Sequence, residues 1–181
     1  TKAVIYVVRD PRNLITSFSH HFSMNVEESY NFIINKKKML TENEWGGKNF
    51  GIASVLGNWA EHYKSWQNIK FAPILTVKYE DLIDNTEREF KKILTYLKKI
   101  MDIKIDEKKI LNTINSCSFK KLAEKEKNEG FSEASKSKKN NEKLNFFYLG
   151  EKNNWKNLLK PEIEEKIRIT FNKEMKELRY I

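Results

Sequence analysis

The chain has few of the residues that stabilise secreted or membrane-spanning proteins. Its 181 residues include one cysteine, Cys117, so no disulfide can form within the chain and a reducing, cytoplasmic compartment is expected. No apolar run approaches the roughly 20 residues that a membrane-spanning helix needs. Only six glycines and three prolines are present, and they form no glycine-rich phosphate-binding loop. These absences exclude a disulfide framework and give no reason to expect a membrane.

The charge is strongly basic. Thirty-four lysines and arginines stand against 25 aspartates and glutamates, which gives a formal net charge of +9. Such a balance favours anionic partners, although a solvated, lysine-rich surface explains the same charge. The length suits one core, so we expect a single domain over residues 1–181. Because Thr1 leads directly into an apolar run, we expect no signal peptide and interpret the chain as the later part of a longer protein.

The most informative stretch lies at the start of the chain. Residues 3–8 form an unbroken apolar run, which predicts a parallel strand buried on both faces. Arg9 follows at the carboxyl end of this strand. Asp10 can cap a helix and Pro11 suits its first turn. In open α/β sheets, anionic ligands bind where a strand ends and such a helix begins.

Arg9 and Ser17 are the candidate anion-binding residues of this stretch. Arg9 carries a planar, permanently charged group that suits phosphate, and Ser17, eight residues on, can add a hydroxyl. Pairing of Arg9 with Asp10, together with an ordinary surface serine, explains the same residues without a ligand. The spacing alone does not decide between the two interpretations.

Further elements follow from apolar periodicity and capping signals. A strand is predicted over 73–79 and loops over 41–51 and 124–143. Helices are predicted over 26–40 and 52–66, from a capping box at Thr86 and Glu89, from Asp106, and from Pro161. The last helix has an apolar stripe of Ile163, Ile167, Phe171, Met175 and Leu178.

The run Val8-Arg9-Asp10-Pro11-Arg12, followed by Ser17 and by His20-His21-Phe22, resembles the 3′-phosphate-binding segment of cytosolic-type sulfotransferases. That family transfers a sulfuryl group from 3′-phosphoadenosine 5′-phosphosulfate (PAPS) to a hydroxyl or amine, without a metal, and releases adenosine 3′,5′-bisphosphate (PAP). The resemblance implies an α/β fold with a parallel sheet flanked by helices, of the P-loop-NTPase-like sulfotransferase kind. It also implies that Arg9 and Ser17 hold the 3′-phosphate of the donor.

Four later segments resemble the family in the same order. They are Gly57-Asn58-Trp59 with His62 and Trp66, Val77–Leu82, Asn115–Leu122 and Asn145–Lys156. The resemblance implies that Tyr79 lies beside the nucleotide and that Phe119 borders the adenine, against which its ring can stack. Without the family, His62 is best interpreted as a helix histidine with a satisfied hydrogen bond.

The last of these segments departs from the family. Where the family has Arg-Lys-Gly, with both basic residues on the 3′-phosphate, this chain has Tyr148-Leu149-Gly150. Lys152 and the backbone N–H of Gly150 are the candidates to compensate. The family's phosphosulfate loop and catalytic histidine precede the matched region. We therefore assign no catalytic residue and expect activity to need upstream residues.

A second interpretation is a non-catalytic, basic α/β module that binds a nucleotide or a nucleic acid. Phe146, Phe147 and Tyr148 with Lys152 would suit stacking on single strands. We favour the sulfotransferase, with a small-molecule acceptor and with neither a membrane nor a nucleic acid as partner. The pocket-forming segments are those that differ from the family, so the sequence specifies neither the acceptor nor the oligomeric state.

Overall fold

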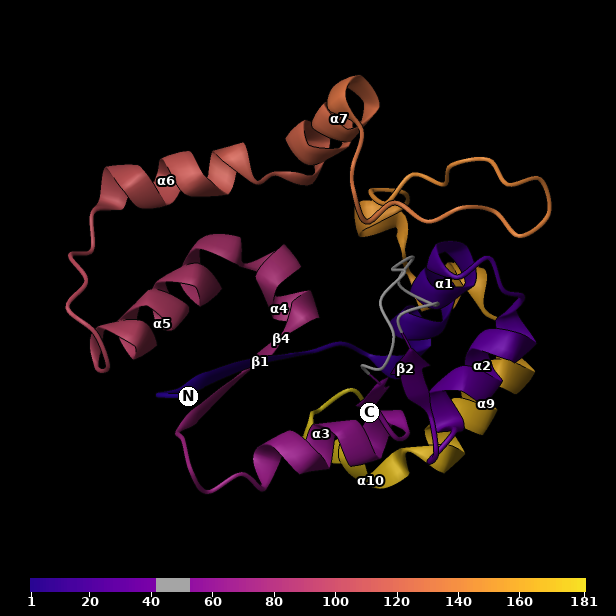
Figure 1. Cartoon of the computed structure of the whole chain (residues 1–181). Coiled ribbons are helices and arrows are strands. Elements are labelled where there is room, and N and C mark those ends of the chain that lie inside the picture. Colours follow the sequence, from indigo (N-terminus) through magenta and orange to yellow (C-terminus); the bar gives the residue numbers. More distant parts are fainter. Residues whose placement is uncertain (42–52) are drawn as a thin grey trace.

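The computed structural model describes residues 1–41 and 53–181, and two parallel strands lie at its centre (Figure 1). β1 (Val4–Val8) pairs with β4 (Ile74–Lys78), with Val4 opposite Ile74 and Val8 opposite Lys78. Arg9 and Asp10 connect β1 to α1 (Pro11–His21), and β4 leads directly into α4 (Tyr79–Asp84). Both helices therefore begin at the carboxyl edge of the sheet. The predicted α/β fold with a parallel sheet flanked by helices is confirmed.

The core lies on one face of β1. Because side chains alternate along a strand, Tyr6 and Val8 point into this core together. They meet α1, α2 (Val26–Ile34), α3 (Trp59–Gln67), α9 (Pro161–Thr170) and α10 (Asn172–Glu177). The stripe predicted for the last helix is confirmed, since its five members are all buried, although a break at Phe171 divides that helix into α9 and α10.

The opposite face of β1 is less covered. Ile5 is 37% exposed and Val7 is 48% exposed, so the prediction of a strand buried on both faces is wrong for the part of the chain that the structure describes. In Figure 1, α4 and α5 (Thr86–Lys98) lie on one side of the strand pair, and α3 and α10 lie on the other. Tyr6 and Val8 of β1 belong to the main apolar cluster, and Val4 packs against it.

Two helices have bounds that differ from those that the sequence predicts. The helix predicted over 26–40 ends at Ile34, and β2 (Met39–Thr41) then pairs antiparallel with β3 (Ala53–Val55). The helix predicted over 52–66 begins only at Trp59, because Asn58 caps it in a box with Glu61. Most of the loop predicted over 41–51 lies outside the described residues.

The second half of the chain forms an outer layer and a return to the core. α6 (Glu107–Ser116) begins at the predicted cap Asp106, and α7 (Phe119–Glu129) follows it. The predicted capping box at Thr86 is wrong, because the Thr86 hydroxyl donates to the Leu82 carbonyl and no side chain caps α5. The predicted loop over 124–143 starts six residues late, after Glu129. It leads to the 3₁₀ helix η2 (Gly150–Lys152) and to α8 (Trp155–Leu158).

Candidate functional site

Arg9 lies at the carboxyl edge of the sheet with a polar atom left unsatisfied. Its guanidinium carbon is 4.3 Å from the centre of the Tyr79 ring, and its carbonyl accepts a 3.2 Å hydrogen bond from the Trp59 indole N–H. Its Nε is buried and makes no hydrogen bond within the described residues. A buried N–H of a permanent cation costs free energy unless an acceptor arrives, so this atom indicates an anion site.

Asp10 does not neutralise Arg9. It caps α1 by accepting a 2.9 Å hydrogen bond from the Arg12 backbone N–H, and its carboxylate pairs with the Arg12 guanidinium at 2.7 Å. Arg12 in turn lies 3.9 Å from the centre of the Trp155 ring. The alternative in which Arg9 pairs with Asp10 is therefore wrong, because Arg12 takes that carboxylate. Arg9 keeps its charge for another partner.

The carboxyl ends of both strands are tied together through Glu80. Its carboxylate accepts a 3.0 Å hydrogen bond from the Asp10 backbone N–H and a 3.1 Å hydrogen bond from the Tyr180 hydroxyl. Burial, and then the neighbouring Glu80 carboxylate, raises the pKa of Tyr180, which keeps that hydroxyl a donor. This arrangement fixes the start of α4 against the start of α1 and so holds Tyr79 beside Arg9.

One face of α1 carries the segment that contains Gly150. Asn13, Thr16 and His20 lie on it, at helical spacing. The Asn13 side chain accepts a 2.9 Å hydrogen bond from the Trp155 backbone N–H, and the Thr16 hydroxyl donates to Asn153. At the other end of the face, His20 shares a 2.7 Å hydrogen bond with the Asn145 carbonyl.

Ser17 lies on the same face, one turn after Asn13 and between the two points of attachment. Its hydroxyl makes no hydrogen bond within the described residues, and its side chain is partly exposed. The segment opposite it holds Gly150 and Lys152. Ser17 therefore lies on the face of α1 to which the segment with Gly150 and Lys152 is attached.

Phe119 and Gly150 are in direct contact. Gly150 has φ +53°, and a Cβ built on it would come within 2.8 Å of the Phe119 ring. Glycine is needed here both for its left-handed backbone and for this close approach. The Phe119 ring, on the first residue of α7, remains 40% exposed.

The expected site residues thus form two pairs, Arg9 with Tyr79 and Phe119 with Gly150, and no ring contact or hydrogen bond between the described residues joins the pairs. Lys152 is exposed and forms no ion pair with a described residue. Tyr148, at the first departing position, stacks on His20 with ring centres 3.8 Å apart and planes within 5°. A ring held by α1 therefore stands where the family has a cation.

Comparison with known proteins identifies the family of this chain. The family described as the sulfotransferase domain matches residues 2–179. The chain belongs to this family.

Several named sulfotransferases are similar to this chain over two thirds of its length or more. Sulfotransferase 1A1 of Rattus norvegicus is 30% identical over 125 residues, which cover 67% of this chain and 38% of the relative. Sulfotransferase 1B1 of Canis lupus familiaris is 27% identical over 176 residues, which cover 95% of this chain and 54% of the relative. Cytosolic sulfotransferase 15 of Arabidopsis thaliana is 28% identical over 167 residues, which cover 91% and 44%. The chain thus spans about half the length of these relatives, or less.

A solved structure supports the fold. Mouse sulfotransferase SULT7A1 complexed with PAP superposes with a TM-score of 0.62 at 20% sequence identity. The superposition covers 96% of this chain and 58% of the mouse chain. The resemblance inferred from five short segments is therefore confirmed for both family and fold.

The sulfotransferase chain also has an apolar cavity beside Arg9, which the sequence interpretation missed. Its volume is about 250 Å³, and Arg9 itself, Leu14, Phe18, Phe32 and Leu56 are among its lining residues. Apolar periodicity predicts a helix face that packs on a core, and it gives no separate signal for a cavity between such faces. His62 lies on its wall with Nδ1 3.0 Å from the Tyr6 hydroxyl, and burial lowers the pKa of His62. Its interpretation as a satisfied helix histidine is confirmed.

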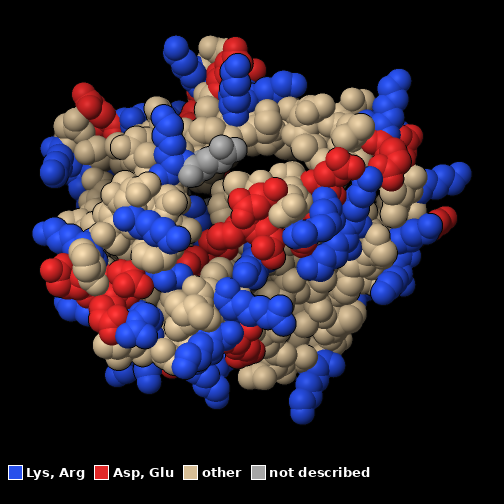
Figure 2. All heavy atoms as spheres, turned by 180° about the vertical axis from the view of Figure 1, so that it is seen from behind, with Lys and Arg blue, Asp and Glu red and all other residues tan. Residues whose placement is uncertain are grey.

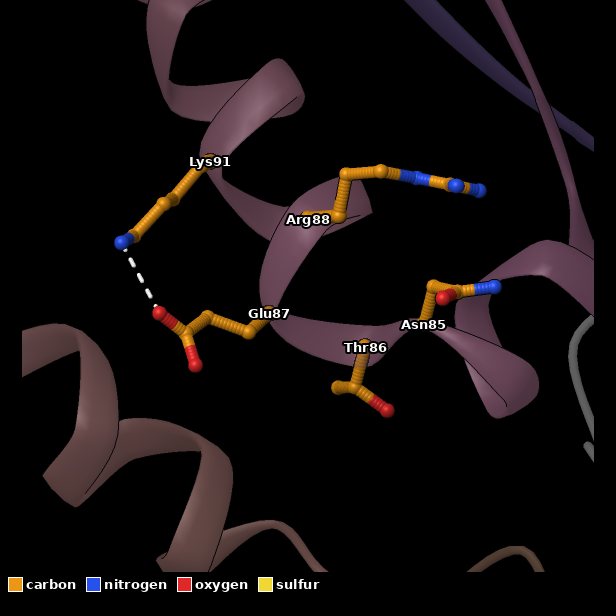
Figure 3. Close-up of a pocket in the computed structure, with 5 residues that line it drawn as sticks. All are labelled: Asn85, Thr86, Glu87, Arg88 and Lys91. Carbon is orange, nitrogen blue, oxygen red and sulfur yellow. Dashed lines mark ion pairs between the residues drawn. The ribbon is translucent and has the colours of Figure 1, made fainter.

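A second hollow, at the start of α5, lacks the features of a binding site. In Figure 3, Lys91 and Glu87 pair with each other on one side of the helix, and Arg88 points to the other side. On the face seen in Figure 2, acidic side chains lie among the basic ones. The aromatic residues proposed for single-strand stacking are engaged within the protein, since Phe146 packs on Phe131 and Tyr148 packs on His20.

The described residues provide neither a metal-binding cluster nor a membrane-spanning helix. Among residues 1–41 and 53–181, no three histidine, cysteine, aspartate or glutamate side chains are grouped so that they could hold a metal ion. Within the same ranges, no helix has the length and apolar character that crossing a membrane requires.

Proposed function

We propose that this chain forms the nucleotide-binding part of a sulfotransferase that transfers the sulfuryl group of PAPS to a hydroxyl or amine of a small molecule. The observation that carries the proposal is the buried, unsatisfied Nε of Arg9 at the carboxyl edge of a parallel sheet. The SULT7A1 structure, solved with PAP, supports the choice of nucleotide. The cytosolic relative from Arabidopsis thaliana and the single cysteine support a cytoplasmic location.

Each site residue has a defined task in this proposal. The Arg9 guanidinium and the Ser17 hydroxyl bind the 3′-phosphate, because a planar cation and a neutral donor suit its oxygens. The Tyr79 ring packs against the Arg9 guanidinium and borders the nucleotide. Phe119 presents its exposed ring to the adenine, while Lys152 and the Gly150 N–H add a flexible charge and a backbone donor.

The cavity beside Arg9 supports a small, largely apolar acceptor. Its apolar side chains make van der Waals contacts and exclude water, while the cationic Arg9 lines the end at which an anionic group can bind. Sulfuryl transfer also needs a base for the acceptor proton and cations at the leaving oxygen. We assign neither task to a residue of this chain, and we propose that other residues of the whole protein perform them.

Isothermal titration of this chain with PAP tests the proposal. We expect saturable binding, and we expect Arg9→Ala to weaken it by about 2–4 kcal/mol, as for a lost charge-assisted contact. Arg88→Ala is the matched control, because it removes an exposed arginine of α5. If the Arg9 variant binds PAP as tightly as the control variant, the assignment of the phosphate site is wrong.

A further inference from the structure

Glu126 is a buried carboxylate with a specific pair of partners. It is 7% exposed on α7, a helix on which Glu124 and Glu129 are exposed. One of its oxygens accepts a 2.7 Å hydrogen bond from the Phe146 backbone N–H, and the other accepts a 2.9 Å hydrogen bond from the Phe147 backbone N–H. Both carboxylate oxygens therefore bind consecutive donors from a segment 20 residues further along the chain.

These two hydrogen bonds place an aromatic group beside Phe119. The rings of Phe146 and Phe147 lie 5.2 Å apart, and Phe131 packs on both, at 4.8 Å and 5.4 Å. The Phe147 ring then meets Phe119 in an edge contact at 6.2 Å and 77°. Phe119 thus has Phe147 and Gly150 as neighbours, and part of its ring stays open to solvent.

We propose that Glu126 is a positioning residue for the base subsite, holding Phe147 against Phe119 so that the Phe119 ring stays oriented toward the adenine. This rests on the proposed function, in which Phe119 stacks on that base. Between α7 and η2 the chain has no helix and only the isolated bridge of Lys136 and Lys143. The two charge-assisted bonds to Glu126 fix the Phe146 and Phe147 backbone to α7, while the contacts of His20 with Asn145 and Tyr148 hold the flanking residues to α1.

Glu126→Gln isolates this effect with little change in shape. An amide has one acceptor oxygen, so its NH₂ group would face a backbone N–H and one of the two bonds would be lost. Glu124→Gln, on the exposed side of the same helix, is the matched control. Each variant is titrated with PAP and with an abasic analogue in which hydrogen replaces the adenine.

We expect Glu126→Gln to weaken PAP binding about tenfold, which is part of what base stacking on an aromatic ring contributes. Binding of the abasic analogue should change less than about twofold, and Glu124→Gln should leave both ligands unaffected. Equal losses for PAP and the abasic analogue would overturn the role in the base subsite, as would no loss for either. If Glu126→Gln does not fold, Phe147→Leu, which removes the ring between Glu126 and Phe119, should give the same selective loss.

Hydrogen exchange without nucleotide separates this inference from the proposed function. The Phe146 and Phe147 amides should exchange slowly in the unaltered chain and faster in Glu126→Gln. Fast exchange in the unaltered chain would overturn the two bonds to Glu126. The other outcome is slow exchange in a chain that does not bind PAP, or that binds PAP and the abasic analogue equally. That result would contradict the proposed function, and the positioning role with it.

Discussion

At the scale of single residues, Gly150 offers a sharp test of how the base subsite is built. Alanine at this position would meet both a left-handed backbone and the Phe119 ring. We expect Gly150→Ala to lower the free energy of unfolding by about 1–2 kcal/mol, the cost of that backbone for other residues, and also to weaken PAP binding by displacing Phe119. Chemical denaturation and isothermal titration measure the two effects.

Gly130→Ala is the control, since Gly130 also has a positive φ of +77° but its added Cβ would meet only the flexible end of Lys143, at 3.1 Å. We expect it to lose stability and to keep its affinity for PAP. Equal affinities of the two variants would show that the contact between Gly150 and Phe119 does not shape the site.

The same scale shows what local sequence patterns predict. The strand before Arg9 and the cap at Asp10 follow from neighbouring residues, and the structure has both. The partner of Asp10 did not follow, because Arg9 and Arg12 are both close to it in sequence. Arg12 is held in place by Trp155, Glu164 and the Tyr180 carbonyl, all far along the chain. The bonds of Glu126 to residues 20 positions away leave no local pattern at all.

At the scale of elements, capping boxes form at two helix starts where none was predicted and fail at the one where a box was predicted. Asn25 with Glu28 and Asn58 with Glu61 form capping boxes, and the second of them sets the true start of α3. The box expected at Thr86 fails because the Glu89 side chain bonds Arg88 and Lys92 instead. The residue types were suitable in each case. Competing partners of the side chains decided which boxes form.

Asp10 allows a prediction about the start of α1. Asp10→Ala removes the cap and leaves the buried Arg12 without its main carboxylate, so we expect a loss of about 3 kcal/mol in the free energy of unfolding. Asn25→Ala removes only an exposed cap of α2 and should cost about 1 kcal/mol. Urea denaturation compares the two. Similar losses for both variants would mean that the Arg12 pair contributes little.

At the scale of the whole molecule, the core joins the two ends of the described chain. Tyr6 and Val8 of β1 belong to the same cluster as Ile167, Phe171 and Met175. Apolar periodicity predicted each stripe separately, but it carries no information on which stripes meet. For the same reason the cavity beside Arg9 could not be predicted, since residues of β1, α1, α2 and α3 line it together.

Histidine burial makes the stability of the whole fold sensitive to mild acid. Burial lowers the pKa of His62, and burial together with the nearby His20 lowers the pKa of His21, which Glu133 opposes. In the unfolded chain both groups return to an ordinary pKa near 6.5. As the pH falls through that value, the unfolded state takes up protons that the folded state does not. The free energy of unfolding should therefore decrease from about pH 7.5 toward pH 5.5, before most carboxylates titrate.

Urea denaturation at pH 7.5, 6.5 and 5.5 measures this decrease, with His62→Gln as the comparison. Glutamine can keep a hydrogen bond to the Tyr6 hydroxyl but carries no titrating group, so the variant should lose less stability over this range than the unaltered chain. The remaining decrease in the variant is assigned to His21. Equal decreases in both proteins would mean that the protonation of His62 is not coupled to unfolding.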